Sequence, residues 1–252
     1  MERRDMGTGW VLLLTALLVC GTLGAALTAN SWKRSFRVER VRTEGNRILA
    51  DSEITALARI PEGEPLFDVD LYRARLRVMQ SPFVRSAVLS RQMPGGLLIT
   101  VKERTPLAAL VFARELYIDG DGFVLPHPHT GSVPDLPVIT GALRAADCTP
   151  GQRTASARVL GAVDILATAA GVGDDLYRLI SEVHCRDDST YLLFTTESGV
   201  PVVFGRGDVA LKLLELDGFW KQVVMQRGPA HLRTVDLRFA DQVVVRWDDA
   251  AH

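Results

Sequence analysis

The sequence lacks the charge surplus and the catalytic motifs that mark many protein classes. Its 29 lysines and arginines nearly balance its 30 aspartates and glutamates, so there is no overall basic field of the kind that nucleic-acid binding uses. The signatures G-x-S-x-G, H-E-x-x-H, S-x-x-K and C-x-x-C do not occur. We therefore expect a protein that is not an enzyme and does not bind nucleic acid.

Cysteine is scarce as well. Of the three cysteines, Cys20 lies in an apolar run, which leaves Cys148 and Cys185. Such a sparse, odd set excludes a disulfide framework. A single bridge between Cys148 and Cys185 stays open in an oxidising compartment, although no sequence pattern brings the two residues together.

Three short motifs suggest metal or adhesion sites, and each has a simpler structural explanation. The D-G-D-G stretch at 119–122 lacks the glutamate that a calcium loop needs at its twelfth position, where Thr130 stands. The H-P-H stretch at 127–129 has no third ligand nearby. The G-R-G-D stretch at 205–208 fits a strand end, a turn and a helix N-cap. We expect no metal and no cofactor.

The main feature present is a long apolar run near the N-terminus. Residues 10–29, WVLLLTALLVCGTLGAALTA, carry no charge. As a helix this run would be about 30 Å long, which matches the hydrocarbon core of a bilayer. Trp10 and Trp32 flank it as interfacial anchors. The sequence predicts a cytoplasmic tail at 1–9 and one transmembrane helix at 10–30.

Two points about this run stay open. Arg3 and Arg4, with small residues at 24–26, also fit a cleaved signal peptide of a secreted protein. Five basic residues lie between 33 and 42 against two before the run, a count that by itself would place the large domain in the cytoplasm. Because long domains translocate largely regardless of charge, we predict a cytoplasmic N-terminus and a periplasmic bulk.

The next segment, 36–105, has the pattern of a small α+β unit. The expected order is strand, helix, helix, strand, strand. The last two strands form a hairpin in which Leu97, Ile99 and Val101 alternate with other residues after a Pro-Gly-Gly turn. The apolar positions expected to face the sheet are Ile54, Leu57 and Ala58 in the first helix and Leu71, Tyr72, Leu76 and Met79 in the second.

The remainder, 106–248, shows short strands and two helical patterns. One helix is expected at 156–170, and another follows Asp208 with Leu211, Leu214 and Trp220 on its apolar face. This pattern predicts a mostly antiparallel β domain with two helices. The final strand should lie at a sheet edge, where main-chain groups stay unpaired.

Several stretches carry a family resemblance. VRTEGNRILADSEI, PEGEPLFDVD and SPFVRSAVLSRQMPGGLLITVKERTPLA resemble the POTRA domain of the bacterial cell-division FtsQ/DivIB family. DGDGFVLP, LPVITG, FGRGDVALKLLEL and VDLRF…VVVRW resemble its β domain. The resemblance implies a POTRA domain at 36–105 and a β domain at 106–248. It implies a non-enzymatic protein of the inner membrane and the division septum, whose partners are FtsB and FtsL and, through them, FtsW and FtsI.

The resemblance also implies a binding site. In this family the C-terminal strand region binds an extended segment of FtsB, and a basic residue beside an aromatic one contributes. The positions that match are Arg238, Phe239, Val243, Val244, Val245, Trp247 and, more loosely, Arg186, with Phe239 standing where some relatives have tyrosine. We predict strand addition along Val243–Trp247, weakened by Val244→Pro or Arg238→Glu with the fold intact. Another POTRA-containing envelope assembly or translocation factor and a membrane-anchored periplasmic enzyme are the alternatives.

Overall fold

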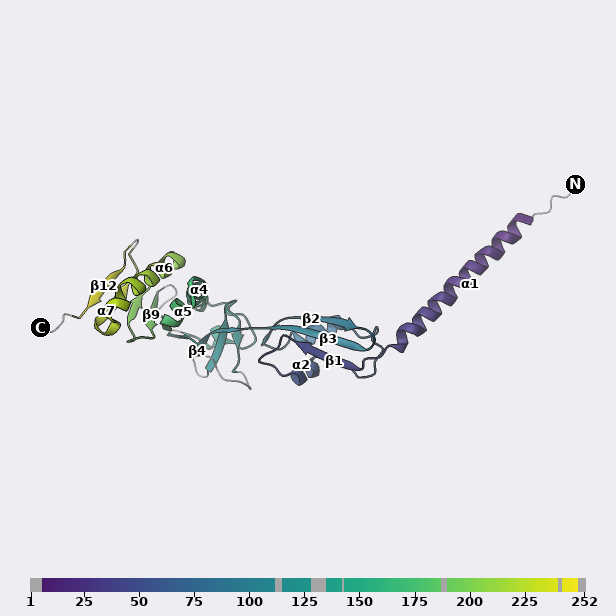
Figure 1. Ribbon diagram of the computed structural model, residues 1–252, viewed down its shortest axis with the longest axis horizontal. Coiled ribbons are helices and arrows are strands. Elements are labelled where there is room, and N and C mark those ends of the chain that lie inside the picture. The colour runs from purple at the N-terminus through teal and green to yellow at the C-terminus, as the bar shows by residue number, and fades with distance from the viewer. Residues whose placement is uncertain are drawn as a thin grey trace. The chain divides into compact units, whose positions relative to one another are not determined.

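The computed structural model describes residues 6–111, 115–127, 135–141, 143–186, 190–239 and 242–248. Contacts within the chain divide it into two compact units, Met1–Glu103 and Arg104–His252. Both are coloured by residue number in Figure 1.

The first element is one long helix, α1 (Met6–Ser35). Its large apolar side chains between Trp10 and Leu23 are 60–72 % exposed. The hydroxyls of Thr15 and Thr22 donate to carbonyls of the preceding turn at 2.9–3.0 Å. Within the described residues, no helix reaches the length and hydropathy that crossing a membrane requires. The transmembrane helix is therefore not confirmed and stays a prediction.

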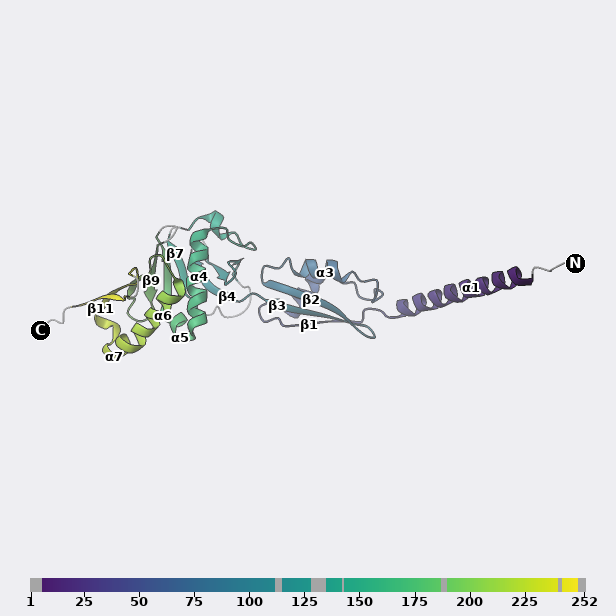
Figure 2. The ribbon, with the colours of Figure 1, turned by 90° about the horizontal axis from the view of Figure 1, so that it is seen from above.

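The rest of the first unit is the expected α+β fold. Its elements are β1 (Arg40–Glu44), α2 (Asp51–Ala58), α3 (Leu71–Val78), β2 (Val84–Gln92) and β3 (Gly96–Glu103). The sheet order is β1-β3-β2, with β1 parallel and β2 antiparallel to β3. Figure 2 shows α3 against this sheet. Buried residues of both helices share one core cluster with β2 and β3, so both helices cover the same face.

The inward face of α3 matches the prediction in part. Leu71 and Met79 pack against the core as predicted, whereas Tyr72 is 65 % and Leu76 is 44 % exposed. Ala74 and Val78 are buried instead. On this side of the helix the Nε of Arg75 donates to a carbonyl of β2 at 2.8 Å. In α2 the predicted Ile54 and Ala58 are indeed buried.

The second unit is built on one large sheet. Its described strands run in the order β12-β11-β10-β9-β8-β7-β4-β5-β6. Their bounds are β4 (Pro106–Val111), β5 (Glu115–Asp119), β6 (Val124–Leu125), β7 (Val138–Gly141), β8 (Ile180–Cys185), β9 (Tyr191–Thr195), β10 (Pro201–Val203), β11 (Leu232–Asp236) and β12 (Val244–Trp247). The helices are α4 (Ala157–Val172), α5 (Asp174–Leu179), α6 (Val209–Phe219) and α7 (Met225–Arg227), with a π-helical stretch Trp220–Val224 between the last two and short 3-10 turns Ala145–Cys148 and Pro229–His231.

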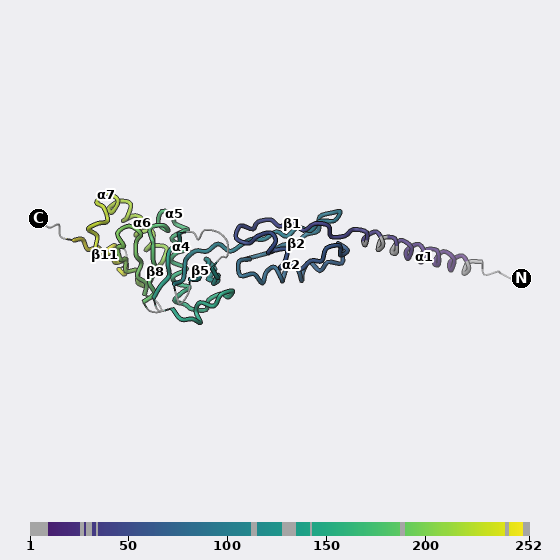
Figure 3. Tube along the Cα trace, turned by 90° about the horizontal axis from the view of Figure 1, so that it is seen from below, coloured from purple at the N-terminus to yellow at the C-terminus, as the bar shows by residue number. Residues whose placement is uncertain are grey.

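The sheet is mostly antiparallel, as predicted, but three neighbouring pairs are parallel: β4–β7, β7–β8 and β10–β11. Parallel neighbours need a crossover, usually helical. Here α4 and α5 connect β7 to β8, and α6 and α7 connect β10 to β11. The two predicted helices are present as α4 and α6, and the structure adds the short helices α5 and α7. Figure 3 shows α6 and α7 near β11 in this unit.

The inward face of α6 also differs from the prediction. Leu213 and Leu216 are buried, while Leu211 is 47 % and Leu214 is 54 % exposed. Trp220 is buried as expected. Lys212 is buried with them, and its ammonium group donates to carbonyls of the loop before the helix.

The two cysteines of this unit are free thiols. Cys148 and Cys185 are both buried in the main core. Burial raises the pKa of the Cys185 thiol to about 11. The bridge between them that the sequence left open is not present.

Candidate partner-binding edge

Strand β12 is the outermost strand of its sheet, next to β11. This confirms the predicted edge position. Val244 and Arg246 are exposed, whereas Val245 and Trp247 are half-buried and pack against the core together with Val243. One face of the strand is therefore anchored, and the other is open to solvent.

Backbone hydrogen bonds define which side of β12 is free. The N–H of Leu237 donates to the carbonyl of Val203 in β10 at 2.9 Å. Since N–H groups alternate along a strand, the N–H of Asp236 faces β12, where Val244 is its register partner. At the other end of β12, the N–H of Asp248 donates to the carbonyl of His231, the residue just before β11, at 2.8 Å.

Because backbone N–H groups alternate in direction, the N–H of Val244 points the same way as that of Asp248, toward β11. The hydrogen bonds at the two ends of the strand therefore give the same assignment. The residues whose backbone N–H and C=O groups face the open edge are then Val243, Val245 and Trp247. This corrects one expectation. A proline at Val244 would remove a donor that faces β11, so it would not leave the fold intact.

Arg238 is held by Asp236, two residues before it. Its Nε lies 2.9 and 3.1 Å from the two carboxylate oxygens, and its Nη2 lies 2.6 Å from Oδ2. The backbone N–H of Arg238 also donates to Oδ1 at 3.0 Å. The hydrogen bonds from Arg238 lower the pKa of Asp236, and the same pairing raises the pKa of Arg238. The guanidinium is thus oriented while its side chain stays 56 % exposed.

A buried lysine holds the loop next to Arg238. Lys212 is 8 % exposed, and its Nζ donates to the carbonyls of Phe204, at 2.9 Å, and Arg206. Burial lowers the pKa of Lys212. Between those carbonyls, Gly205 has φ +67°, and a Cβ there would lie 2.6 Å from Cγ of Arg238. Glycine therefore lets the arginine side chain pack on this loop.

Two aromatic candidates have different environments. Phe239 follows Arg238 and is 50 % exposed, so its ring is available for contact. Trp247 is half-buried, and the guanidinium of Arg227 lies 5.7 Å from its ring centre. Trp247 thus serves the core as well as the edge.

Arg186 does not join this group. It is exposed just past the end of β8. Three strands lie between β8 and β12, a separation of about 19 Å at the usual strand spacing. A strand that pairs with β12 would not reach Arg186, although a partner that extends across the sheet would.

Sequence reasoning missed three residues of the site: Asp236, Lys212 and Arg246. The period-two pattern of β11 offered a signal for the first, because residues two apart on a strand share a face. The indication for Lys212 was weaker, because it is a single charged residue among the apolar residues of the inward face of α6. Arg246 lies beside the exposed Val244.

The motifs that suggested other chemistry have structural roles. The Oδ1 of Asp119 accepts the N–H of Phe123 at 2.8 Å, and its Oδ2 accepts Nη1 of Arg104 at 2.6 Å, which closes the β5–β6 turn. Asp208 caps α6 by accepting the N–H of Leu211 at 3.0 Å. Of the H-P-H stretch, only His127 lies in the described residues. Among the residues described, no three or more His, Cys, Asp or Glu side chains gather as metal ligands do.

Comparison with known proteins identifies the family. The model of the POTRA domain, FtsQ-type, matches residues 36–104, and that of the cell division protein FtsQ/DivIB C-terminal region matches residues 110–238. The Cell division protein FtsQ of Rhodothermus marinus is 34% identical over 242 residues, covering 93% of this chain and 85% of that protein.

The same-named proteins of Salinibacter ruber and Syntrophotalea carbinolica are 31% and 30% identical, and the matches cover 92% and 84% of this chain and 91% and 74% of those proteins. The first matched region covers the part of the first unit that follows α1, and the second covers most of the second unit. The chain belongs to the FtsQ/DivIB family of cell-division proteins.

Proposed function

We propose that this chain is a non-enzymatic, single-pass division protein that captures FtsB and FtsL through the open edge of β12 and, through them, links FtsW and FtsI to the septum. The observation that carries the proposal is the free edge of β12, together with an oriented, exposed arginine two residues past the end of β11. An extended segment of a partner would add to the sheet, its main chain supplying affinity and its side chains specificity.

The geometry suggests what kind of segment fits. Its main chain would pair with the outward groups of Val243, Val245 and Trp247. Its side chains would meet the exposed face made by Val244 and Arg246. With Arg238 nearby, this edge carries two arginines, so the partner segment should alternate apolar and acidic residues.

The proposal includes a membrane anchor in α1. The run at 10–29 has no charged residue, and its large apolar side chains are exposed all round the helix. A helix that is apolar on every side suits lipid rather than water. Its threonine hydroxyls are satisfied within the helix, as a bilayer requires. We place the N-terminus in the cytoplasm, α1 in the inner membrane, and the POTRA and β domains in the periplasm.

Calorimetry tests the binding proposal. The full chain in detergent is titrated with overlapping peptides of FtsB from the same organism. We expect Arg238→Glu to abolish most of the binding and Arg144→Glu, at an exposed arginine elsewhere in the unit, to leave it unchanged. Arg186→Glu reports whether the partner extends across the sheet. Equal binding by the Arg238 and Arg144 variants would contradict the proposal.

Localisation tests the division role. An N-terminal fluorescent fusion at native expression should form a band at midcell. Such a band would also support a cytoplasmic N-terminus, because the tag must fold there. A uniform signal around the envelope would instead favour another envelope assembly role.

A further inference from the structure

The open face of the POTRA sheet carries two arginines without partners. Arg40 and Arg42 are exposed on β1, with Val41 between them packed into the core. Within the described part of the chain, neither guanidinium has a hydrogen-bond or ion-pair partner. An arginine pair that serves no internal contact is available for an external anion.

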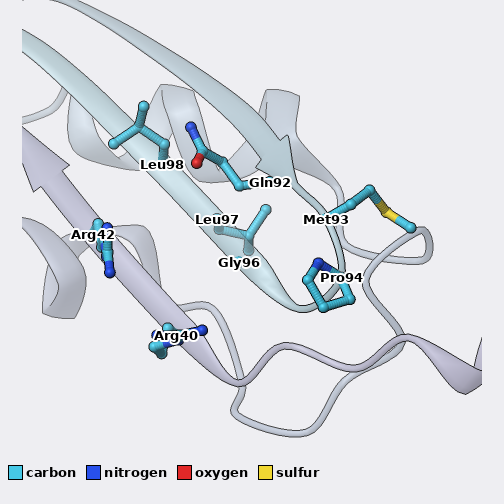
Figure 4. A pocket seen from close by; sticks show the side chains of 8 residues that line it. All are labelled: Arg40, Arg42, Gln92, Met93, Pro94, Gly96, Leu97 and Leu98. Atoms are coloured by element: carbon cyan, nitrogen blue, oxygen red, sulfur yellow. The ribbon is translucent and has the colours of Figure 1, made fainter.

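These arginines border a shallow pocket of about 130 Å³. In the register of the sheet, Arg40 lies opposite Gly96 and Arg42 lies opposite Leu98. Met93, 53 % exposed, and Pro94 complete the pocket at the tip of the β2–β3 hairpin (Figure 4). The pocket thus combines two cations with an apolar rim.

The pocket lies close in the chain to the end of α1. Ser35 ends α1, and Arg40 follows five residues later, a reach of at most about 18 Å. The hairpin tip is tied to this connection, because the carbonyl of Gly95 accepts the N–H of Glu39 at 2.8 Å and of Arg40 at 3.3 Å. If α1 spans a bilayer, the pocket is therefore held near the headgroup layer.

Other charges at this end do not cancel the pair. Arg37 is occupied, since its Nη1 donates to the carbonyl of Gly63 at 2.6 Å. The side chain of Glu39 lies beside Gly95 at the tip of the hairpin. The carboxylates of Glu62 and Glu64 lie on the loop that pairs with Arg37. Glu44 lies on the same face of β1, two residues past Arg42. Within the described residues, neither Glu39 nor Glu44 lines the pocket or forms an ion pair with Arg40 or Arg42, so the pocket itself carries only the two arginines as charges.

We propose that this face binds the phosphate headgroups of anionic phospholipids, with Arg40 and Arg42 as the ligands of the phosphate and Met93 in contact with the acyl boundary. The inference rests on the proposed membrane anchor. The proposal gives the basic residues after the apolar run a role on the periplasmic side of the membrane. The positive-inside rule by itself would have placed these residues in the cytoplasm.

The test uses the full chain in lipid nanodiscs. An environment-sensitive dye is placed at Ser90→Cys, next to the pocket, in a Cys20→Ser background where the remaining cysteines are buried. Phosphatidylcholine alone is compared with a mixture containing phosphatidylglycerol. We expect a dye shift only with the anionic lipid, weakened by salt. Arg40→Ala with Arg42→Ala should lower the docked-to-free ratio about 25-fold, since each arginine near an anionic surface contributes roughly fivefold.

The control pair is Arg47→Ala with Lys102→Ala, two exposed cations at the opposite end of the sheet, which should leave the shift unchanged. A shift that ignores lipid charge, or that falls equally in both pairs, would overturn the inference. Reversal by inorganic phosphate at constant ionic strength would assign the face to a free anion instead. Failure of the chain to copurify with nanodiscs would remove the anchor, and this inference with it.

Discussion

A pair of proline substitutions at adjacent residues of β12 separates binding from folding. Val245 presents its N–H to the open edge, whereas Val244 presents its N–H to β11. Proline removes one donor in each case, but the donor serves a different neighbour. We expect Val245→Pro to weaken capture of the partner strand and Val244→Pro to weaken the β11–β12 ladder.

The expected sizes follow from single hydrogen bonds. Losing the outward donor leaves a carbonyl of the partner unpaired, which costs about 1–3 kcal/mol, or roughly 5- to 150-fold in affinity. Proline is tolerated on edge strands where no ladder bond is lost, so Val245→Pro should destabilise the fold by only about 1 kcal/mol, through its half-buried side chain. Val244→Pro should cost about 1–3 kcal/mol of stability.

The assay pairs calorimetric titration of the partner peptide with thermal unfolding of the full chain. In a unit of this size, 1 kcal/mol shifts Tm by about 2–4 °C. Val244→Thr keeps the backbone donor and serves as the control for the side chain. If Val245→Pro binds the peptide normally, or if both prolines lower Tm equally, the assignment of the two strand sides is wrong.

Three further substitutions test the support around Arg238. Asp236→Asn should weaken partner binding with a modest loss of stability, because the Arg238 side chain is 56 % exposed although that of Asp236 is only 16 % exposed. Hydrogen bonds from Arg238 hold the pKa of Asp236 below its ordinary 3.8, so binding should be flat from about pH 5 to 8 and fall only in acid, measured by titration at several pH values. Lys212→Met should lower Tm by about 4–8 °C in a thermal melt, since a buried charged donor to two carbonyls contributes roughly 2 kcal/mol. Gly205→Ala should cost about 1–2 kcal/mol in chemical unfolding, from its positive φ, and should weaken partner binding by moving Arg238. An Asp236→Asn protein with normal affinity, a Lys212→Met protein with unchanged Tm, or a Gly205→Ala protein with normal stability and affinity would each contradict the role given to that residue.

The sequence predicted the order of elements in the POTRA unit and the edge position of the last strand, because both depend on local signals. Period-two alternation and the Pro94 turn define the hairpin, and a terminal strand commonly lies at an edge. Contacts between distant elements were not predictable. Parallel pairing of β10 with β11 depends on the helical crossover between them, and alternating residues carry no mark of strand direction.

The buried faces of two helices were also not predictable from the sequence alone. In α3 and α6, apolar residues occur on two stripes, and spacing alone does not choose between them. In each helix a basic side chain on the inward side also bonds to a backbone carbonyl: Arg75 to one in β2, and Lys212 to those of Phe204 and Arg206. The partners in such contacts are not apparent from the sequence pattern. In the sequence, the basic residue is visible only as a charge that interrupts an apolar helical pattern.

An open edge strand is also a hazard, because it invites pairing with any exposed strand. Strand β12 limits that hazard through its short length and its charges. It has four residues, its solvent face carries Arg246, and the pair of Arg233 with Asp248 flanks its end. Two copies of this edge would bring like charges together, which disfavours self-pairing. A partner strand with acidic residues would relieve the same repulsion, so the charges that protect the free protein would also select its partner.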